Sequence, residues 1–89
     1  MRIEFDPAKD VSNQTKHGLS LGLAAELEWD AAWVWVDVRY EYGEERMTAL
    51  APRDQILYCV AFVERAEARR IISLRRANRR EVQHYVESL

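Results

Sequence analysis

The alternation of polar and apolar side chains changes its period along the chain. Residues 2–5 alternate like a half-buried strand, and Asp6-Pro7 then supplies the capping residue and first-turn proline of a helix. We expect this helix to end near His17-Gly18, because glycine adopts the left-handed C-terminal conformation without steric cost. Ser20 can cap a second helix, and the apolar spacing predicts a short amphipathic one over residues 21–29.

From about residue 33 onward, β-branched and aromatic residues separated by turn signals predict strands. We place them at residues 33–40, 44–51, 55–64 and 68–75. The breaks fall at Tyr42-Gly43, at residues 52–54 and at residues 65–67. Such short connections join antiparallel neighbours. The run of residues 56–63 has no polar face, so it predicts a central strand that is covered on both sides.

The last segment predicts an amphipathic helix. Asn78 is a good N-cap and Glu81 follows three residues later, which is the spacing of a capping box. The apolar stripe of this helix consists of Val82, Tyr85, Val86 and Leu89. We expect the Tyr85 ring to lie in the core rather than to act as a catalyst. Together the elements predict an α+β fold, in which an N-terminal strand and two helices pack on a largely antiparallel sheet of three to four strands and a C-terminal helix closes the core.

Composition places these elements in one domain. The 89 residues are 48% hydrophobic and 31% charged, which is typical of a globular chain with a modest core. We expect neither a membrane span nor a signal peptide, and therefore a cytoplasmic protein. The single cysteine, Cys59, excludes an intramolecular disulfide and a thiolate metal cluster, and its apolar surroundings predict an inert, buried side chain.

The net charge of −2 conceals an asymmetry. Residues 1–64 hold six Lys/Arg and twelve Asp/Glu, whereas residues 65–89 hold seven Arg and three Glu. Six of these arginines lie within twelve residues: Arg69, Arg70, Arg75, Arg76, Arg79 and Arg80. Guanidinium groups bind phosphate or carboxylate through two parallel hydrogen bonds, which suggests an anionic partner. The alternative is that acidic residues of the first part of the chain pair with them.

The candidate chemistry is narrow. The sequence has no phosphate-binding glycine loop, metal-ligand spacing or nucleophile elbow, so we expect neither a cofactor nor a metal. The remaining Arg, Glu, His and Tyr side chains suit acid–base and electrostatic catalysis on a phosphodiester. RNA brings its own nucleophile, because the ribose 2′-hydroxyl can attack the adjacent phosphate. An enzyme then needs only to move protons and neutralise charge.

Four segments carry a family resemblance. They are FDPAK at residues 5–9, KHG at 16–18 with Ser20, GEER at 43–46, and RIISLRRANRRE at 70–81 followed by Tyr85. In this order and spacing the chain resembles the BrnT family of bacterial toxins. The resemblance implies a RelE-like fold and a ribonuclease that inhibits translation as the toxin of a type II toxin–antitoxin system. It also implies a BrnA-like antitoxin with a ribbon-helix-helix domain, and repression of the operon by the complex, which would contact operator DNA through the antitoxin.

Candidate catalytic residues come from three segments. His17 could act as a general acid or base, because imidazole exchanges protons near neutral pH, or it could cap the last carbonyls of its helix, which we favour. Glu45 could accept the 2′-hydroxyl proton while Arg46 holds the phosphate, or both could serve cross-strand charge pairing. For stabilising transition-state charge, Arg75 is the first choice, followed by Arg46 and Arg70.

The other arginines and the tryptophans suggest binding. We expect Arg69, Arg76, Arg79 and Arg80 to position RNA or to bind the antitoxin. Trp29, Trp33 and Trp35 could stack on bases, but Trp33 and Trp35 share strand parity, so we interpret them as core or interface residues. The main alternative function is a non-catalytic interaction or co-repressor module that binds an antitoxin or nucleic acid. A nucleic-acid binder without hydrolysis is a further one.

Overall fold

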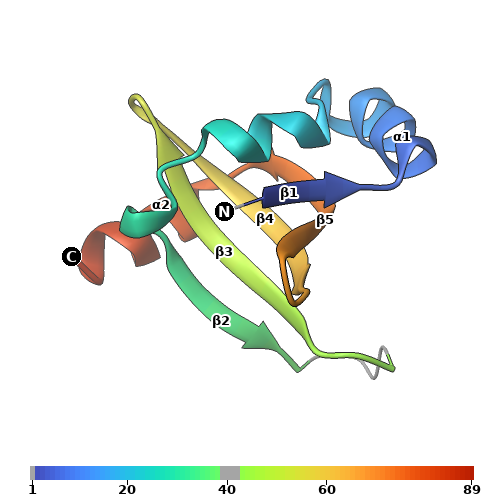
Figure 1. The fold of residues 1–89 in the computed structure, drawn as a ribbon. Helices are drawn as coiled ribbons and strands as arrows, with labels where there is room; N and C mark the ends of the chain where they lie inside the picture. The colour runs from blue at the N-terminus through green and yellow to red at the C-terminus, as the bar shows by residue number, and fades with distance from the viewer. Residues whose placement is uncertain (1, 39–42) are drawn as a thin grey trace.

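The computed structural model describes residues 2–38 and 43–89. In chain order the elements are β1 (Arg2–Phe5), α1 (Pro7–His17), the 3₁₀ helices η1 (Leu21–Glu26) and η2 (Trp29–Ala31), β2 (Trp33–Asp37), β3 (Arg46–Arg53), β4 (Ile56–Glu64), β5 (Ala68–Arg76) and α2 (Arg79–Glu87). The predicted α+β class is confirmed (Figure 1). None of the helices in the described part of the chain is long and apolar enough to cross a bilayer.

The sheet has five strands in the order β1-β5-β4-β3-β2. Strands β2 to β5 form consecutive antiparallel pairs, whereas β1 pairs in parallel with β5 and places Ile3 opposite Arg69. The prediction of three to four strands is therefore wrong, because the N-terminal strand joins the sheet as an edge strand. Alternation identifies β1 as a strand, but it carries no information on a partner at the far end of the chain.

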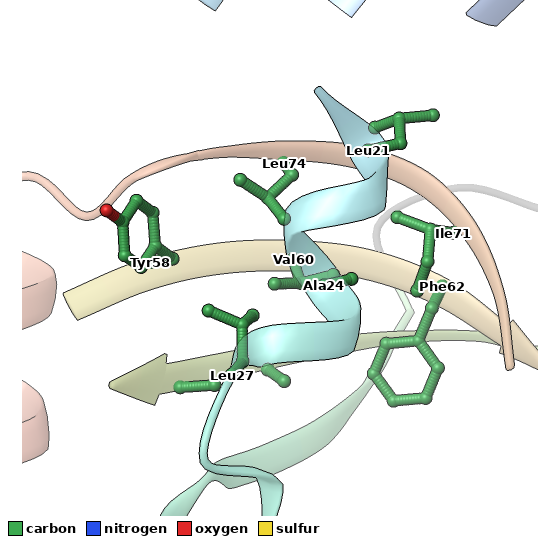
Figure 2. Packing of buried hydrophobic residues seen from close by; sticks show 10 residues of the cluster. Leu21, Ala24, Leu27, Tyr58, Val60, Phe62, Ile71 and Leu74 are labelled. Atoms are coloured by element: carbon green, nitrogen blue, oxygen red, sulfur yellow. The ribbon is translucent and has the colours of Figure 1, made fainter. Parts of the chain in front are cut away.

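The core lies on one face of the sheet, under η1 (Figure 2). Leu21, Ala24 and Leu27 from η1 and its C-cap point toward the sheet. The sheet contributes the buried residues Ala49, Ala51, Tyr58, Val60, Phe62, Ile71 and Leu74. As predicted, β4 is central. The expected cover on both sides is incomplete, because η1 covers one face while Cys59 and Ala61 on the other line a hollow. The face of the sheet opposite η1, called here the open face, carries the candidate site.

Helix α1 begins and ends as the sequence predicts. The Asp6 carboxylate accepts a hydrogen bond from the Ala8 N–H (2.9 Å), Pro7 is the first helical residue, and Gly18 ends the helix with φ 71°. In the middle of the helix, the buried side chain of Asn13 joins α1 to the sheet. Its carboxamide donates to the Leu74 carbonyl (2.8 Å) and accepts from the Leu74 N–H (3.0 Å). The pairing of β1 with β5 ends at Ile71, so β1 offers no hydrogen-bond partner to the backbone of Leu74. The Asn13 side chain takes the place of that partner.

Two predicted boundaries differ from the structure. Residues 21–29 do not form one helix, because η1 ends at Glu26 and the Trp29 indole N–H donates back to the Ala24 carbonyl (2.8 Å), starting a separate turn. Strand β3 runs through Pro52 rather than breaking there, and the hairpin turns at Asp54, which has φ 56°. The Pro52 carbonyl accepts from the Glu28 N–H (2.8 Å).

The predicted strand over residues 33–40 is described only in part. Its structured portion, β2, ends at Asp37. Arg39, Tyr40 and the Tyr42 half of the predicted turn lie outside the described residues. Gly43, in the other half of that turn, has φ 81°, which is the left-handed conformation that glycine adopts readily.

Helix α2 is capped as predicted, but it does not close the core. Asn78 and Glu81 form the reciprocal capping box. No residue of α2 is buried, however, and Val86 and Leu89 are 58% and 86% exposed. Because η1 already fills the core, α2 docks instead through hydrogen bonds of Glu81 and Tyr85 and through the ring contact of His84 with Trp33. Tyr85 is a half-buried tether whose hydroxyl donates to the Ala31 carbonyl (2.7 Å), so its expected core position is wrong.

Candidate functional site

Strand alternation sorts the predicted arginines between the two faces of the sheet. Arg75 pairs with Cys59, and Arg70 pairs with Val63, on the face opposite the core residues Leu74 and Ile71. Arg46 begins β3 on this same open face, directly opposite Asp37 of β2. The three arginines proposed to bind phosphate therefore share one face.

The first part of the site is a hollow of about 310 Å³ between α1 and the sheet, called here the basic hollow. It is lined by Lys9, Ser12, Asn13, Lys16, His17, Arg46, Ile72 and Ser73. The structure thus brings His17 and Arg46 together from distant segments, and two lysines lie beside them. The described lining holds three formal positive charges and no carboxylate, in a chain whose net charge is −2. A concave surface with charges of one sign focuses the field and attracts anions.

The position of His17 shows which of its two predicted roles, helix cap or acid–base group, is compatible with the structure. The backbone N–H of Gly18 donates to the Gln14 carbonyl (2.8 Å) and so caps the end of α1. Within the described residues, the His17 side chain makes no hydrogen bond to a helix carbonyl, so the capping role that we favoured for the ring is not observed. The imidazole is exposed at the basic hollow.

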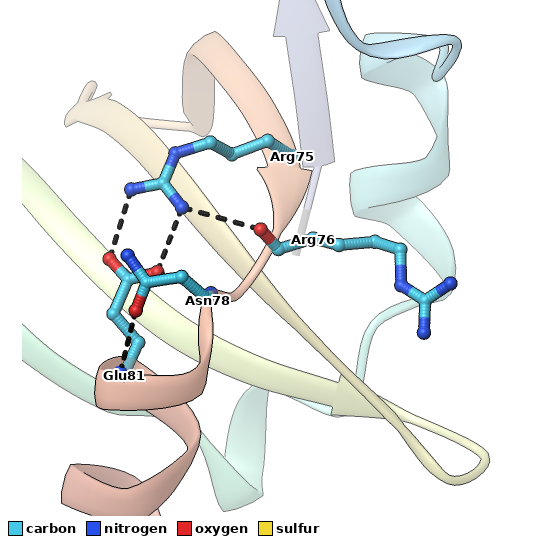
Figure 3. A network of polar contacts seen from close by, with 4 residues as sticks. All are labelled: Arg75, Arg76, Asn78 and Glu81. Atoms are coloured by element: carbon cyan, nitrogen blue, oxygen red, sulfur yellow. Dashed lines mark hydrogen bonds and ion pairs between the residues drawn. The ribbon is translucent and has the colours of Figure 1, made fainter.

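A second hollow of about 300 Å³, called here the polar hollow, adjoins the first. It is lined by Trp35, Thr48, Cys59, Ala61, Ser73, Arg75 and Glu81. Both terminal nitrogens of Arg75 donate to the Glu81 carboxylate (2.8 and 2.9 Å), as Figure 3 shows. Arg75 also donates to the Arg76 carbonyl (3.3 Å). The guanidinium is therefore held in a fixed orientation and is neutralised by a carboxylate of its own chain.

Glu81 is a site residue that the sequence analysis missed. Its place in the capping box already explains why a glutamate stands there, so nothing in the sequence pointed to a second role beside Arg75. The hydrogen bond from Arg75 is the largest effect that holds the pKa of the Glu81 carboxyl below its ordinary value of 4.5. The Asn78 backbone N–H (2.9 Å) and the Cys59 thiol act in the same direction. Cys59 is buried as predicted, but it faces this hollow rather than the apolar core.

This lowered pKa predicts an acid-dependent loss of stability. A carboxyl whose pKa is lowered in the folded state adds stability above pH 4.5, and that contribution disappears as the pH falls through the folded-state value. We expect the free energy of unfolding of the wild type to exceed that of Glu81→Gln by about 1 kcal/mol at neutral pH, and the difference to vanish in acid. Urea titrations from neutral pH to pH 3 measure it. A difference that does not change with pH would contradict the assignment.

The third hollow, called here the aromatic hollow, has a volume of about 360 Å³. It is lined by Trp33, Trp35, Leu50, Arg80, Glu81 and His84. Trp35 and Glu81 also line the polar hollow, and Ser73 lines both the polar and basic hollows. The three hollows therefore adjoin one another along the open face, from α1 to α2.

The three tryptophans have different environments. Trp29 packs edge-to-face on Phe62 with ring centroids 5.3 Å apart, beside the core as expected. Trp35 is 36% exposed, so a core position is wrong for this residue. The Trp33 ring lies 4.3 Å from that of His84, and this contact helps to hold α2 against β2.

Several predicted site residues lie away from the hollows. Arg69 is on the core face, where its guanidinium lies 4.5 Å from the centre of the Trp29 ring and pairs with Glu64. Figure 3 shows the Arg76 side chain directed away from Arg75. The expected pairing with acidic residues of the first part of the chain is therefore found for Arg69, whereas the partner of Arg75 is Glu81 of the C-terminal part.

Of the four remaining predicted site residues, only Arg80 lines one of the three hollows. Arg80 lines the aromatic hollow, whereas Arg79 is an exposed residue at the start of α2. Glu45 is exposed just before Arg46, and neither it nor Arg70 lines the three hollows. Residues 2–38 and 43–89 contain no group of three His, Cys, Asp or Glu side chains that could hold a metal ion.

The comparison with protein families identifies the class of this chain. The sequence model of the family described as "Ribonuclease toxin, BrnT, of type II toxin-antitoxin system" matches residues 5–81. The chain belongs to the BrnT family. No curated protein matches the chain. The matched range includes the last residue of β1, Phe5, all of α1 and of strands β2 to β5, and the first turn of α2, so it covers the basic and polar hollows.

Proposed function

We propose that the chain is an endoribonuclease that cleaves RNA by attack of the ribose 2′-hydroxyl and needs no metal ion. The observation that carries this proposal is the basic hollow, which unites His17 with Arg46 and two lysines in a member of a ribonuclease toxin family. Cationic side chains supply the charge neutralisation, and an imidazole supplies a proton acceptor.

In the proposed reaction, the neutral imidazole of His17 takes the proton from the 2′-hydroxyl. The 2′-oxygen then forms a bond to phosphorus and the bond from phosphorus to the 5′-oxygen breaks. The leaving 5′-oxygen takes a proton from water. The products are a 2′,3′-cyclic phosphate and a 5′-hydroxyl. Arg46 stabilises the additional negative charge on the phosphoryl oxygens of the transition state.

The other predicted residues take secondary roles. Because Glu81 neutralises Arg75 in the adjoining polar hollow, we infer that Arg75 contacts the next phosphate along the strand rather than the scissile one. Arg70 shares the open face and extends its positive charge. Glu45 stays a prediction as an alternative base, and the location of His17 in the hollow favours the imidazole. Arg76 and Arg79 are exposed and suit contacts with RNA or with the antitoxin.

Membership in the family implies an antitoxin partner as well as an RNA substrate. We infer that the antitoxin is BrnA-like, with a ribbon-helix-helix domain through which the complex contacts operator DNA and represses its operon. We also infer that RNA cleavage by the free toxin inhibits translation, and that the fold is RelE-like. These inferences rest on the family alone and stay predictions.

Incubation of the purified protein with RNA in excess chelator tests the proposed activity. We expect cleavage that leaves a 2′,3′-cyclic phosphate, because the nucleophile belongs to the substrate. An otherwise identical strand with a 2′-deoxynucleotide at the cleaved position should remain intact. Cleavage that requires a divalent ion, or that proceeds equally at the deoxynucleotide, would overturn the mechanism.

The same experiment tests the second candidate, a non-catalytic module that binds an antitoxin or nucleic acid. The observation that favours it is the neutralisation of Arg75 and Arg69 by carboxylates of the chain itself. This alternative predicts intact RNA even at high protein concentration. Binding without cleavage that weakens steeply with added salt would assign the basic hollow to RNA binding alone.

A further inference from the structure

The aromatic hollow is a largely apolar surface whose charged lining residues are Arg80 and Glu81, the partner of Arg75. Trp35 forms the wall that it shares with the polar hollow, where Arg75 lies. The indole of Trp35 is 36% exposed, and it makes a tilted contact with Trp33 at 5.2 Å between ring centroids. Arg80 adds a cation to the lining. A partly exposed aromatic side chain beside cationic groups is the arrangement with which proteins bind single-stranded nucleic acid.

We propose that the aromatic hollow binds one unpaired base of the RNA strand by stacking on Trp35. The proposal rests on the proposed function and deepens it, because it assigns a subsite for the substrate. A strand whose phosphates follow Arg46 and Arg75 along the open face would bring a base to Trp35, since the hollows adjoin in that order. A base held in a double helix has no free face to offer, so the subsite selects single strands.

The contacts of the two tryptophans indicate a structural role for Trp33 and leave Trp35 available for binding. Trp33 is stacked on His84 and so contributes to the attachment of α2. In the described part of the chain the Trp35 side chain makes no hydrogen bond, and more than a third of the residue's surface is exposed. The hollow of about 360 Å³ lies within the range of pockets that bind small molecules.

Binding of a single-stranded RNA oligonucleotide with 2′-O-methyl groups, which cannot be cleaved, tests this subsite. Fluorescence anisotropy gives the dissociation constant for the wild type, Trp35→Phe and Trp35→Leu. Leucine keeps the apolar bulk but removes the π-face, and phenylalanine keeps a smaller π-face. We expect Trp35→Leu to bind roughly tenfold more weakly than the wild type and Trp35→Phe to retain most of the affinity. Circular dichroism confirms that both variants fold.

A second set of oligonucleotides, in which each base in turn is removed, completes the test. Removal of the base that occupies the hollow should weaken binding to the wild type roughly tenfold and leave binding to Trp35→Leu unchanged. Equal affinity of the wild type and Trp35→Leu for the intact strand would overturn the subsite, as would equal affinity of the wild type for every abasic strand.

The binding measurement is independent of cleavage, so the two proposals can fail separately. Trp35-dependent binding by a protein that does not cut RNA would support the subsite and overturn the nuclease. Cleavage of RNA by the wild type, with no dependence of binding on Trp35, would overturn the subsite alone.

Discussion

Replacing Arg46 with alanine is expected to lower the rate of RNA cleavage by about 100- to 1000-fold while leaving the fold intact. The residue begins β3 on the open face and lines the basic hollow with His17. Removing a charged donor that acts on the transition state costs this much in enzymes that depend on electrostatic stabilisation. Single-turnover cleavage of a labelled oligonucleotide in excess chelator measures the effect, and Arg46→Lys should retain part of the activity.

Arg76→Ala is the matched control. It also removes one arginine of the sheet, but its side chain is exposed, lines none of the three hollows and is directed away from Arg75 (Figure 3). We expect its cleavage rate to stay within about threefold of the wild type, because an exposed charge outside the site contributes mainly to weak association. If both variants lost activity equally, overall positive charge would matter and the basic hollow would not be the active site.

Replacing His17 with alanine isolates the proton-transfer step. General base catalysis contributes about 100- to 10,000-fold, so a loss in this range is expected. Single-turnover cleavage of a labelled oligonucleotide measures the loss. Lys16→Ala, a change at the preceding residue of the same hollow, should weaken binding of the RNA but leave the cleavage rate of bound RNA within about tenfold of the wild type. Cleavage by His17→Ala at the wild-type rate would shift the base to another group, with Glu45 the first to test.

The second large effect concerns stability. Asn13→Ala is expected to lower the free energy of unfolding by about 3 kcal/mol, because the Leu74 N–H and carbonyl lose their hydrogen-bond partner in a buried place. The Leu19 carbonyl loses its bond from the same carboxamide (2.8 Å). Urea unfolding followed by circular dichroism measures the loss.

Two further variants of α1 show whether the loss comes from these hydrogen bonds. Asn13→Asp keeps an acceptor for the Leu74 N–H but has no N–H donor, so it should not restore stability. Gln14→Ala removes a neighbouring exposed amide, which donates to Asp10 (3.0 Å), and should cost about 0.5 kcal/mol or less. A loss below about 1 kcal/mol for Asn13→Ala would show that water replaces the carboxamide.

The capping residues and the strand alternation were readable from the sequence because each is a local property. Asp6, Gly18 and Asn78 mark helix ends as predicted, and the apolar run of β4 marks the central strand. The partner of β1 was not readable, because parallel pairing with β5 depends on the whole chain. The prediction that α2 closes the core was wrong for a related reason. The spacing of its apolar residues shows a helix with one apolar face, but it does not show that η1 covers the core instead.

The candidate site, too, has features that local sequence patterns predict and features that depend on the whole fold. Residue types singled out the arginines, and strand parity then places Arg46, Arg70 and Arg75 on one face. Parity could not show that Glu81 holds Arg75, since that contact depends on how α2 docks after β5. The proximity of His17 to Arg46 likewise requires α1 to lie beside the sheet, which Asn13 enforces through a hydrogen bond to Leu74, 61 residues along the chain.

The parallel pairing of β1 with β5 has a consequence during synthesis. Strand β5 is made late in synthesis. Its residues 68–71 pair with β1, and its Leu74 binds Asn13 of α1. The lysines and imidazole from α1 therefore cannot meet Arg46 and Ser73 in a stable hollow on a nascent polypeptide that stops before β5. The basic hollow, which carries the proposed nuclease site, can therefore form only after β5 has left the ribosome.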